Sequence, residues 1–599
     1  MKPIGIDLGT TNSCIATIEN GFPRVIATDG RNILPSVVCY KDGEVIVGNK
    51  ALNQALIYPK NTIHSVKRLI GNDFDKIAEL DFKFQYDVVD HNKEPYILVD
   101  ENEISPTVVS SEILKTLKKN AEDYLQEPIQ DVVITVPAYF NDQQRQETKV
   151  AGRLAGLNVI RIINEPTAAA LAFGLNANNR EEESKIVVFD LGGGTFDVSI
   201  LEIEKDEEFG SFFKVLSTSG DNFLGGNDFN QVLYNYALST FETANNIKVV
   251  SLDALTRLES AVEKAKIDLS TSFETEINIP YFVAGEKPLH LSQKISRAKY
   301  EELCADLLER IEKPCLQALS DAKLLANNVD EVILIGGMTR TPMIVDKVKE
   351  IFTCKIRNDI NPDESVAIGA AIQADIILND KDVTLVDVIP LSIGISVENG
   401  RFNPIILKNS PIPARVSQEF TTADDNQENV EIAIYQGERL LAKENKFLGK
   451  VVLNNIPLLP KGTPVILVTL EVSEDGTLNV FAEDENKLSS ISARLEVSGG
   501  LTEDEIKAIL EESERKKQED LNQLEILKYK NYIEKILFSI KKNLKEDECS
   551  DALKQYIIKV PFLLESDKKD KEFVKLLEEF YSKFGQLYYR DLKRDNNEN

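Results

Sequence analysis

The stretch Asp7-Leu8-Gly9-Thr10-Thr11 decides how the rest of the chain is interpreted, because a related stretch, Asp190-Leu191-Gly192-Gly193-Gly194-Thr195, follows much later. Each copy comes after a short apolar run typical of a buried strand. Glycines let backbone N–H groups approach phosphate oxygens, threonine hydroxyls add donors, and the leading carboxylate can hold a hard cation through its waters. One copy alone could be an ordinary tight turn. Two copies predict a nucleotide held between two related lobes.

The composition limits the classes of function. At 599 residues the chain is too long for one hydrophobic core, so we expect several domains. The formal charge of -29, from 98 acidic and 69 basic residues, makes binding to nucleic acid or to an anionic membrane unfavourable. We therefore expect neither nucleic acid nor a membrane as a partner.

Cysteine usage and the N-terminal residues indicate the compartment. The six cysteines lie far apart without C-x-x-C spacing, which favours a reducing environment over a zinc site or a disulfide framework. The first residues lead directly into a predicted strand, and no apolar run reaches bilayer length. These features predict a cytoplasmic protein without a signal segment.

The chain divides into four predicted regions. Residues 1–380 mix strand-like runs with amphipathic helical stretches, such as 109–125 and 297–326, and are predicted to form an α/β domain. Residues 381–388 form a short acidic linker with an apolar centre. Residues 389–500 show turn signals and alternating apolar positions typical of an antiparallel β-sandwich. Residues 501–599 begin with a capping box and are predicted to be a charged helical region.

Three shorter stretches are ambiguous by themselves. The run Ile335-Gly336-Gly337-Met338-Thr339-Arg340 follows another predicted strand and could accept a nucleoside. Lys67 and Arg68 stand between apolar positions, although a solvated basic pair is the simpler explanation. Glu165 precedes a helix of small residues, where its carboxylate either faces a metal or caps the helix. The spacing leaves these alternatives open.

Five motifs occur in order along the chain and carry a resemblance to a known family. Together they resemble the seventy-kilodalton heat-shock chaperones in their bacterial DnaK form, from residue 1 to about 510. The resemblance implies an actin-like (ribonuclease H-like) two-lobed ATPase domain, then an antiparallel β-sandwich that binds peptides, then an α-helical lid. The motifs are Gly5-Ile6-Asp7-Leu8-Gly9-Thr10-Thr11-Asn12-Ser13, Val136-Pro137-Ala138-Tyr139-Phe140-Asn141-Asp142, Asn164-Glu165-Pro166-Thr167-Ala168-Ala169-Ala170, the run from Asp190 to Asp197, and Gln436-Gly437-Glu438-Arg439.

The resemblance implies hydrolysis of ATP to ADP and phosphate, with Mg²⁺ and K⁺ as cofactors. The residues that would hold the β- and γ-phosphates are Thr10, Thr11 and Asn12 on one side and Gly192, Gly193, Gly194 and Thr195 on the other. The residues with catalytic roles would be Asp7, Glu165 and Asp190, which support a hydrated Mg²⁺, Lys67 near the γ-phosphate, and Thr195 and Asp197 near the attacking water. Those around the adenosine would be Glu263, Lys266, Ser270, Gly336, Gly337, Arg340 and Asp363. Ile267 and Met338 stand where many members carry a polar residue, so we expect more apolar packing there.

The resemblance also implies an apolar cleft in the sandwich for an extended peptide, with Val430 at the floor of a central pocket. The residues of this cleft would be Ile393, Ile395, Val397, Phe420, Ala423, Val430 and Ile432. For Val430 and Ile432 taken alone, the alternation in a strand favours the other interpretation, that they fill the sandwich core. Glu398 stands where relatives have an apolar residue that arches over the peptide, so closure of that arch is in doubt.

Communication between the domains would run through the linker residues Val383, Leu385 and Asp387. Pro137 and Arg145 resemble the family's relay from the cleft, whereas Arg161, Asn164 and Asp387 match positions used in stimulation by J-domain co-chaperones. Segment 281–296 resembles the loop of members that use an exchange factor of the GrpE type. The implied partners are therefore unfolded hydrophobic polypeptides, a J-domain co-chaperone and a GrpE-type exchange factor.

Two other functions remain open at this point. Sugar and glycerol kinases share the ATPase fold, although they do not need a sandwich and a lid. A specialised relative, the iron–sulfur scaffold chaperone HscA, is favoured by Ala370-Ala371-Ile372-Gln373-Ala374-Asp375-Ile376 and by Gln418-Glu419-Phe420-Thr421-Thr422. We favour a general DnaK-type chaperone over both.

Overall fold

The computed structural model describes residues 2–494, except 29, 81, 177–182, 207–209, 286, 358–360, 398–399, 475 and 485–489. The chain forms two compact units, Met1–Gly500 and Leu501–Asn599. The predicted helical region at 501–599 and the arch residue Glu398 therefore lie outside the described residues. The division into domains at residues 380, 388 and 500 stays a prediction.

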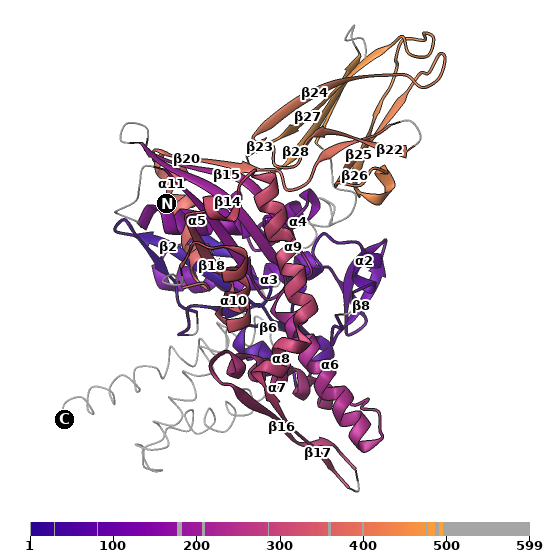
Figure 1. The fold of residues 1–599 in the computed structure, drawn as a ribbon. Coiled ribbons are helices and arrows are strands. Elements are labelled where there is room, and N and C mark those ends of the chain that lie inside the picture. Colours follow the sequence, from indigo (N-terminus) through magenta and orange to yellow (C-terminus); the bar gives the residue numbers. More distant parts are fainter. Residues whose placement is uncertain are drawn as a thin grey trace, which may run out of the picture. The chain divides into compact units, whose positions relative to one another are not determined.

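Two mixed sheets repeat one topology. The first runs in the order β12-β11-β1-β2-β3, and the second contains β19-β18-β13-β14-β15 in the same order (Figure 1). In each, the strand that contains a motif aspartate pairs antiparallel with its successor and parallel with a later strand. This repeat confirms the mixed α/β prediction for the first part of the chain. The strands are β1 (Ile4–Asp7), β2 (Asn12–Glu19), β3 (Phe22–Val25), β11 (Asp131–Val136), β12 (Asn158–Asn164), β13 (Glu183–Leu191), β14 (Phe196–Asp206), β15 (Gly210–Asp221), β18 (Glu331–Ile335) and β19 (Lys355–Arg357).

Helices follow the strands in the same order in both repeats. The last helix of one repeat packs closely against the last helix of the other. A Cβ atom on Gly369 would lie 1.7 Å from the carbonyl oxygen of Ala168, and one on Gly5 would lie 2.0 Å from the backbone nitrogen of Ala371. Neighbouring backbones approach this closely only where side chains are small, which explains the runs of alanine and glycine. The helices are α4 (Asp142–Leu154) and α5 (Glu165–Asn176) in the first half, and α10 (Pro342–Ile351) and α11 (Ser365–Asn379) in the second.

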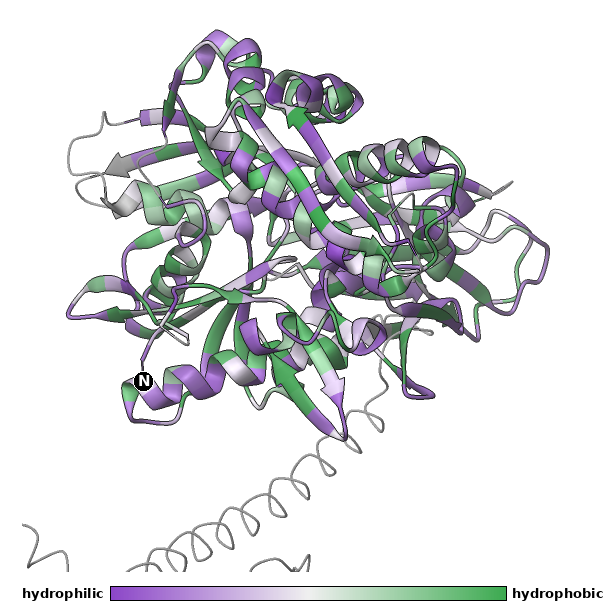
Figure 2. Cartoon of the chain, turned by 90° about the horizontal axis from the view of Figure 1, so that it is seen from below, coloured by the Kyte–Doolittle hydropathy of each residue, from purple (hydrophilic) through white to green (hydrophobic). Residues whose placement is uncertain are grey.

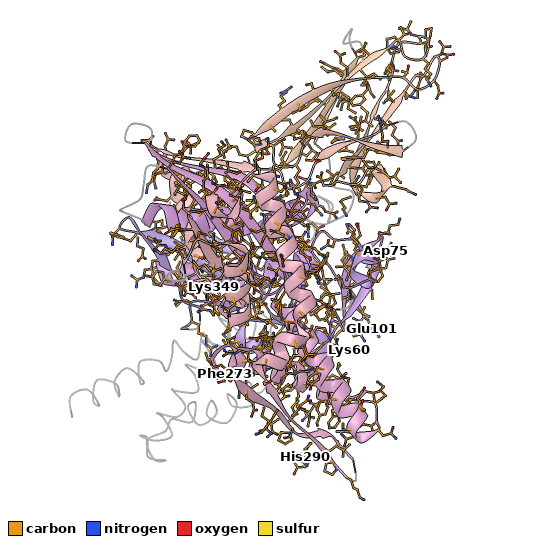
Figure 3. The ribbon with its side chains drawn as sticks, viewed as in Figure 1. Lys60, Asp75, Glu101, Phe273, His290 and Lys349 are labelled. Atoms are coloured by element: carbon orange, nitrogen blue, oxygen red, sulfur yellow. The ribbon has the colours of Figure 1, made fainter. Side chains whose placement is uncertain are left out.

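Each half carries its own additional elements. The amphipathic stretch at 109–125 lies in one helix, as predicted, whereas 297–326 forms two helices that end at Asp321. The break lies at Cys304, whose ψ of 6° places it outside the α-helical region. Figure 3 labels Phe273, directly before β16 (Glu274–Val283), and His290, on β17 (Leu289–Ser296), which pair as a hairpin in the second half. The first half adds β4 (Leu34–Pro35), β5 (Val38–Lys41), β6 (Glu44–Val47), α1 (Asn49–Leu52), β7 (Thr62–Ile63), α2 (Phe74–Ala78), β8 (Asp87–His91), β9 (Glu94–Val99), β10 (Asn102–Ile104) and α3 (Pro106–Leu125), and the second adds α6 (Gly226–Asn245), α7 (Leu252–Thr271), β16 (Glu274–Val283), β17 (Leu289–Ser296), α8 (Arg297–Leu303) and α9 (Ala305–Asp321).

The predicted linker forms strand β20 (Val383–Val388). It extends the second sheet, because residues 383–386 pair in parallel with residues 211–214 of β15. The side chains of Val383 and Leu385 pack against the apolar cluster between the two sheets. The apolar residues of this segment therefore add a strand to the sheet, and β23 (Pro411–Ile412) pairs with its far end.

The region from residue 389 onward contains two antiparallel four-stranded sheets. Their orders are β22-β21-β25-β26 and β24-β27-β28-β29, and their facing side chains share one apolar core. Alternating burial along β25 and β28 confirms the period-two pattern expected from the sequence. The strands are β21 (Ile393–Val397), β22 (Arg401–Ile406), β24 (Ala414–Thr421), β25 (Val430–Gln436), β26 (Lys446–Leu453), β27 (Val465–Val472), β28 (Leu478–Asp484) and β29 (Ser490–Arg494).

Figure 2 shows hydrophilic and hydrophobic residues interspersed along the coloured helices and strands. In the part of the chain drawn in colour, no helix combines the length and the apolar character that crossing a bilayer requires.

Candidate functional site

The two related stretches predicted to hold phosphates, residues 7–11 and 190–195, are called the phosphate loops below. They face each other at the ends of β1 and β13. A Cβ atom on Gly193 would lie 1.9 Å from Thr11 Oγ1, and one on Gly194 would lie 2.6 Å from Thr10 Cγ2. Any larger residue at these two positions would push the loops apart. The loops of the two sheets therefore touch across the cleft, and glycine is required for that contact.

A cavity of about 580 Å³ opens between the loops and is lined by both halves. Gly194 and Asp197 lie next to it: Gly194 contacts Thr10, and Asp197 pairs with Asp190 on the neighbouring strand. The structure thus brings together residues that are far apart in sequence. The predicted residues that line the cavity are Asp7, Thr10, Thr11, Asn12, Lys67, Glu165, Asp190, Gly192, Gly193, Thr195, Glu263, Lys266, Ser270, Gly336, Gly337, Arg340 and Asp363.

Buried carboxylates crowd one end of the cavity. Burial, and secondarily the charge of Glu165, raise the pKa of Asp7 to about 7 and the pKa of Asp197 to about 7. The same two causes raise the pKa of Asp190 well above its ordinary value. These shifts mean that the site disfavours several negative charges at once. A bound cation would relieve that cost.

Lys67 is the cationic side chain among these carboxylates. It belongs to the buried turn η2 (Val66–Arg68), and its Nζ forms an ion pair with Glu165. Thr135 Oγ1 donates to Asp7 at 3.1 Å, and the backbone N–H of Tyr139 donates to Asp197 at 3.0 Å. Each acid except Asp190 therefore has an identified hydrogen-bond or ion-pair partner that fixes its orientation. Glu165 also begins helix α5, so both of its alternative roles remain compatible with the structure.

The donor set suits a hydrated divalent cation, since hard cations prefer carboxylate oxygens and water. Within the described ranges, no three Asp, Glu, His or Cys side chains lie close enough together to coordinate a metal by themselves. The predicted support of Mg²⁺ through water by Asp7, Glu165 and Asp190 stays a prediction.

The opposite end of the cavity combines a cationic and an apolar wall. Lys266 is buried on α7, where burial lowers its pKa, and its Nζ donates to the carbonyl of Gly226 at 3.2 Å. Arg340 Nη2 forms an ion pair with Asp363 at 2.6 Å. Ile267 and Met338 both line the cavity, as the sequence suggested for an apolar wall.

Arg68 is a buried residue to which the sequence assigned no role. Its guanidinium forms an ion pair with Asp228, and its Nη2 donates to the carbonyl of Gly194 at 3.1 Å. Arg68 therefore joins the first half of the chain to the second phosphate loop. The sequence did offer one sign that Arg68 is buried: the pair Lys67-Arg68 has apolar neighbours on both sides, which a solvated pair does not need.

The residues predicted for communication converge on strand β20. Asp387 accepts hydrogen bonds from Asn164 Nδ2 at 2.8 Å and from Thr167 Oγ1 at 3.0 Å, and its burial raises its pKa. Arg145 Nη2 donates to Asn164 Oδ1 at 2.6 Å and to the carbonyl of Ala138 at 3.1 Å. A chain of hydrogen bonds thus leads from β20 to the segment after β11. Thr167 was absent from the sequence-based set.

The remaining residues of this set lie close by. Arg161, on β12, forms an ion pair with Glu474, which follows β27. Pro137 is buried directly after β11 and accepts from the N–H of Phe140 at 3.2 Å. Arg161 therefore links the first sheet to the sandwich.

The predicted peptide-binding residues fall into two groups. Ile393, Ile395 and Ile432 are buried in the sandwich core, as the alternative interpretation expected for Ile432. Val397, Phe420 and Val430 are only partly buried against that core, and Ala423 is exposed. The half-exposed group is the part of the set that an added peptide could contact.

The family model described as Hsp70 protein matches residues 3–590, nearly the whole chain. The match covers both halves of the nucleotide cavity, strand β20 and the two sheets of the sandwich.

Proposed function

This chain belongs to the Hsp70 family, and we propose that ATP hydrolysis in its nucleotide cavity controls how tightly its β-sandwich holds extended hydrophobic peptide segments. Members of the family are ATP-dependent chaperones that bind ATP or ADP with Mg²⁺. The observation that carries the proposal is the direct contact between the two phosphate loops above a cluster of buried carboxylates.

Positioning and electrostatics account for the proposed hydrolysis. Thr10, Thr11 and the backbone of residues 192–195 hold the phosphates, and Lys67 places positive charge beside the γ-phosphate. When bound, Mg²⁺ supplies neutralisation of the charge on the phosphate oxygens. Asp197, fixed by the N–H of Tyr139, orients the attacking water and accepts its proton.

Coupling to the sandwich follows from strand β20. Its pairing with β15 and the bonds from Asn164 and Thr167 to Asp387 fasten the start of the sandwich to the sheets of the cleft. If nucleotide favours this fastened state, peptide binding must in turn alter nucleotide affinity, because such coupling is reciprocal. We further propose a J-domain co-chaperone and a GrpE-type exchange factor as partners, K⁺ as a second cofactor, and a reducing, cytoplasmic location.

Hydrolysis and peptide release test this function together. The proposal predicts ATP turnover without any small-molecule acceptor, an increase of that turnover by an unfolded apolar peptide, and faster peptide release with ATP than with ADP. Fluorescence anisotropy of a labelled peptide measures the release. Equal release rates with the two nucleotides would contradict the proposal, and turnover that required a sugar or glycerol would indicate a kinase.

A specialised role in iron–sulfur cluster assembly is the second candidate. It is favoured by the HscA-like stretches at 370–376 and 418–422, which lie on α11 and at the end of β24. A labelled peptide containing Leu-Pro-Pro-Val-Lys, compared with a generic apolar peptide, distinguishes the two roles. Selective binding of the first peptide would replace the general role with the specialised one.

A further inference from the structure

The segment that follows the Lys67 turn lies directly against helix α4 at Gly71. A Cβ atom on Gly71 would lie 2.7 Å from Gln144 Cα, so the two backbones are in contact. Gly71 has a φ of +60°, a conformation that glycine adopts without strain. The position of Lys67 is therefore tied to the position of α4 through the three residues that separate Lys67 from Gly71.

A buried carboxylate fastens this contact. Glu147 Oε2 accepts from the N–H of Gly71 at 3.1 Å and from Thr107 Oγ1 at 2.9 Å, and Gln143 Nε2 donates to its Oε1 at 3.2 Å. All of these residues are buried. A carboxylate is costly to bury, and three converging donors indicate a built site for it.

The same helix also contacts the sandwich. The N–H of Asp142 donates to Gln436 Oε1 at 3.4 Å, and Gln146 Nε2 donates to Thr477 Oγ1 at 3.1 Å. A shift of α4 caused by the sandwich would therefore also displace the contact between α4 and Gly71.

We propose that Glu147 is a positioning residue for Lys67: by accepting from the N–H of Gly71, its carboxylate anchors the segment that follows the lysine's turn to α4, the helix that the sandwich contacts. This inference rests on the proposed ATP hydrolysis. Glu147 does not line the nucleotide cavity, so it acts through the geometry of Lys67 and not by touching the nucleotide.

Because the carboxyl group of Glu147 titrates, its positioning of Lys67 should depend on pH. Burial, followed by the nearby charge of Glu94 on β9, raises the pKa of Glu147 to about 7, whereas the donors Thr107 on α3, Gln143 on α4 and Gly71 lower it. Above that pH the carboxylate is ionised and holds all three donors. Below it the carboxyl is protonated, and its hold on the turn weakens.

The test compares Glu147→Ala, Glu147→Gln and Thr107→Val in the full chain, with Glu112→Gln on the same domain's α3 as a matched control. Single-turnover hydrolysis and ATP affinity are measured separately from pH 6 to pH 8.5. We expect Glu147→Ala to slow hydrolysis by on the order of ten- to a hundredfold, because small misplacements of catalytic groups have effects of this size. ATP affinity should be unchanged in this variant. The ratio of the wild-type rate to the Glu147→Gln rate should rise with pH through 7, and Glu112→Gln should match the wild type.

Each outcome bears on the inference. Wild-type rates and a wild-type pH profile in both Glu147 variants would overturn it. If Glu147→Ala loses ATP binding by misfolding, Thr107→Val decides, since it removes only one hydroxyl donor, and an unaltered rate there would overturn the inference as well. A wild-type chain without turnover, or a fully active Lys67→Ala, would instead contradict the proposed hydrolysis.

Discussion

The nucleotide cavity and the β-sandwich bury different kinds of side chain. The cavity concentrates acidic side chains whose pKa values rise because they are buried together, whereas the centre of the sandwich is a cluster of apolar side chains. In the proposed function, a bound cation would offset the negative charge of the first region, and a bound peptide would cover the half-exposed apolar side chains of the second. Strand β20 joins these two regions.

The comparison also concerns rigidity. The glycines of one phosphate loop lie so close to the threonine side chains of the other that no larger residue fits, while the predicted peptide contacts Val397, Phe420 and Val430 are half-exposed side chains on strands. Substitutions in the cavity should therefore have large effects on the rate of hydrolysis, and substitutions in the sandwich should have smaller effects on peptide affinity.

The largest effect is expected for Lys67→Ala. Lys67 pairs with Glu165 among the buried acids of the cavity. Its loss should slow hydrolysis by on the order of a hundredfold or more, because a preorganised positive charge is removed. Peptide binding to the sandwich should persist. Single-turnover hydrolysis and anisotropy measure the two properties, and the exposed Lys60→Ala serves as the control (Figure 3). Hydrolysis at the wild-type rate in Lys67→Ala would remove the distinction between the regions.

A smaller effect is expected for Val430→Phe. Added bulk at this half-buried position should cost about 1–3 kcal/mol of peptide binding, which is roughly a 5- to 150-fold weaker affinity. ATP affinity should stay the same. The matched control is Val416→Phe on β24, where the side chain is 38% exposed. Equal peptide affinity in the two variants would place the peptide site elsewhere.

The junction between the regions should respond to pH through Asp387. Its pKa is raised by burial in the paired state of β20, so this state binds a proton more readily than a state with β20 released. The contribution to pairing is fully present below the ordinary pKa of aspartate and is lost as the pH rises through the raised value. Within that window we expect pairing to weaken by up to about tenfold per pH unit.

Hydrogen exchange of the β20 amides at a series of pH values measures this pairing. Asp387→Asn should remove the pH dependence, because the amide does not titrate. A pH dependence that survives in Asp387→Asn would assign the effect to another group.

The smallest effect is expected for the ion pair between Asp73 and Lys446, at 2.6 Å, which links the segment after the Lys67 turn to β26. The Asp73 side chain is 39% exposed, so solvent screening reduces its contribution to about 0.2–1 kcal/mol. A double-mutant cycle with Asp73→Ala and Lys446→Ala, read by β20 exchange, measures the coupling. The exposed pair Arg415–Glu471 within the sandwich is the control and should show none.

Much of the fold followed from local patterns. The helical stretch in α3 and the alternation along β25 predicted the α/β region and the antiparallel region, whereas most of the cavity residues came from the resemblance to a known family. The helix break at Cys304 was missed, because an apolar periodicity can continue across a residue whose backbone leaves the helix.

The sequence by itself determined the two related loops, the strand alternation and, through its motifs, the family, because turn glycines and alternating apolar residues act over a few neighbouring residues. Only the tertiary structure decided that Thr10 and Thr11 touch Gly194 and Gly193, that Arg68 spans both halves, and that Glu147 holds Gly71. These contacts join residues that are between 76 and 184 positions apart, as for Glu147 with Gly71 and Gly194 with Thr10. Their geometry depends on how the sheets pack, and packing is a property of the whole chain.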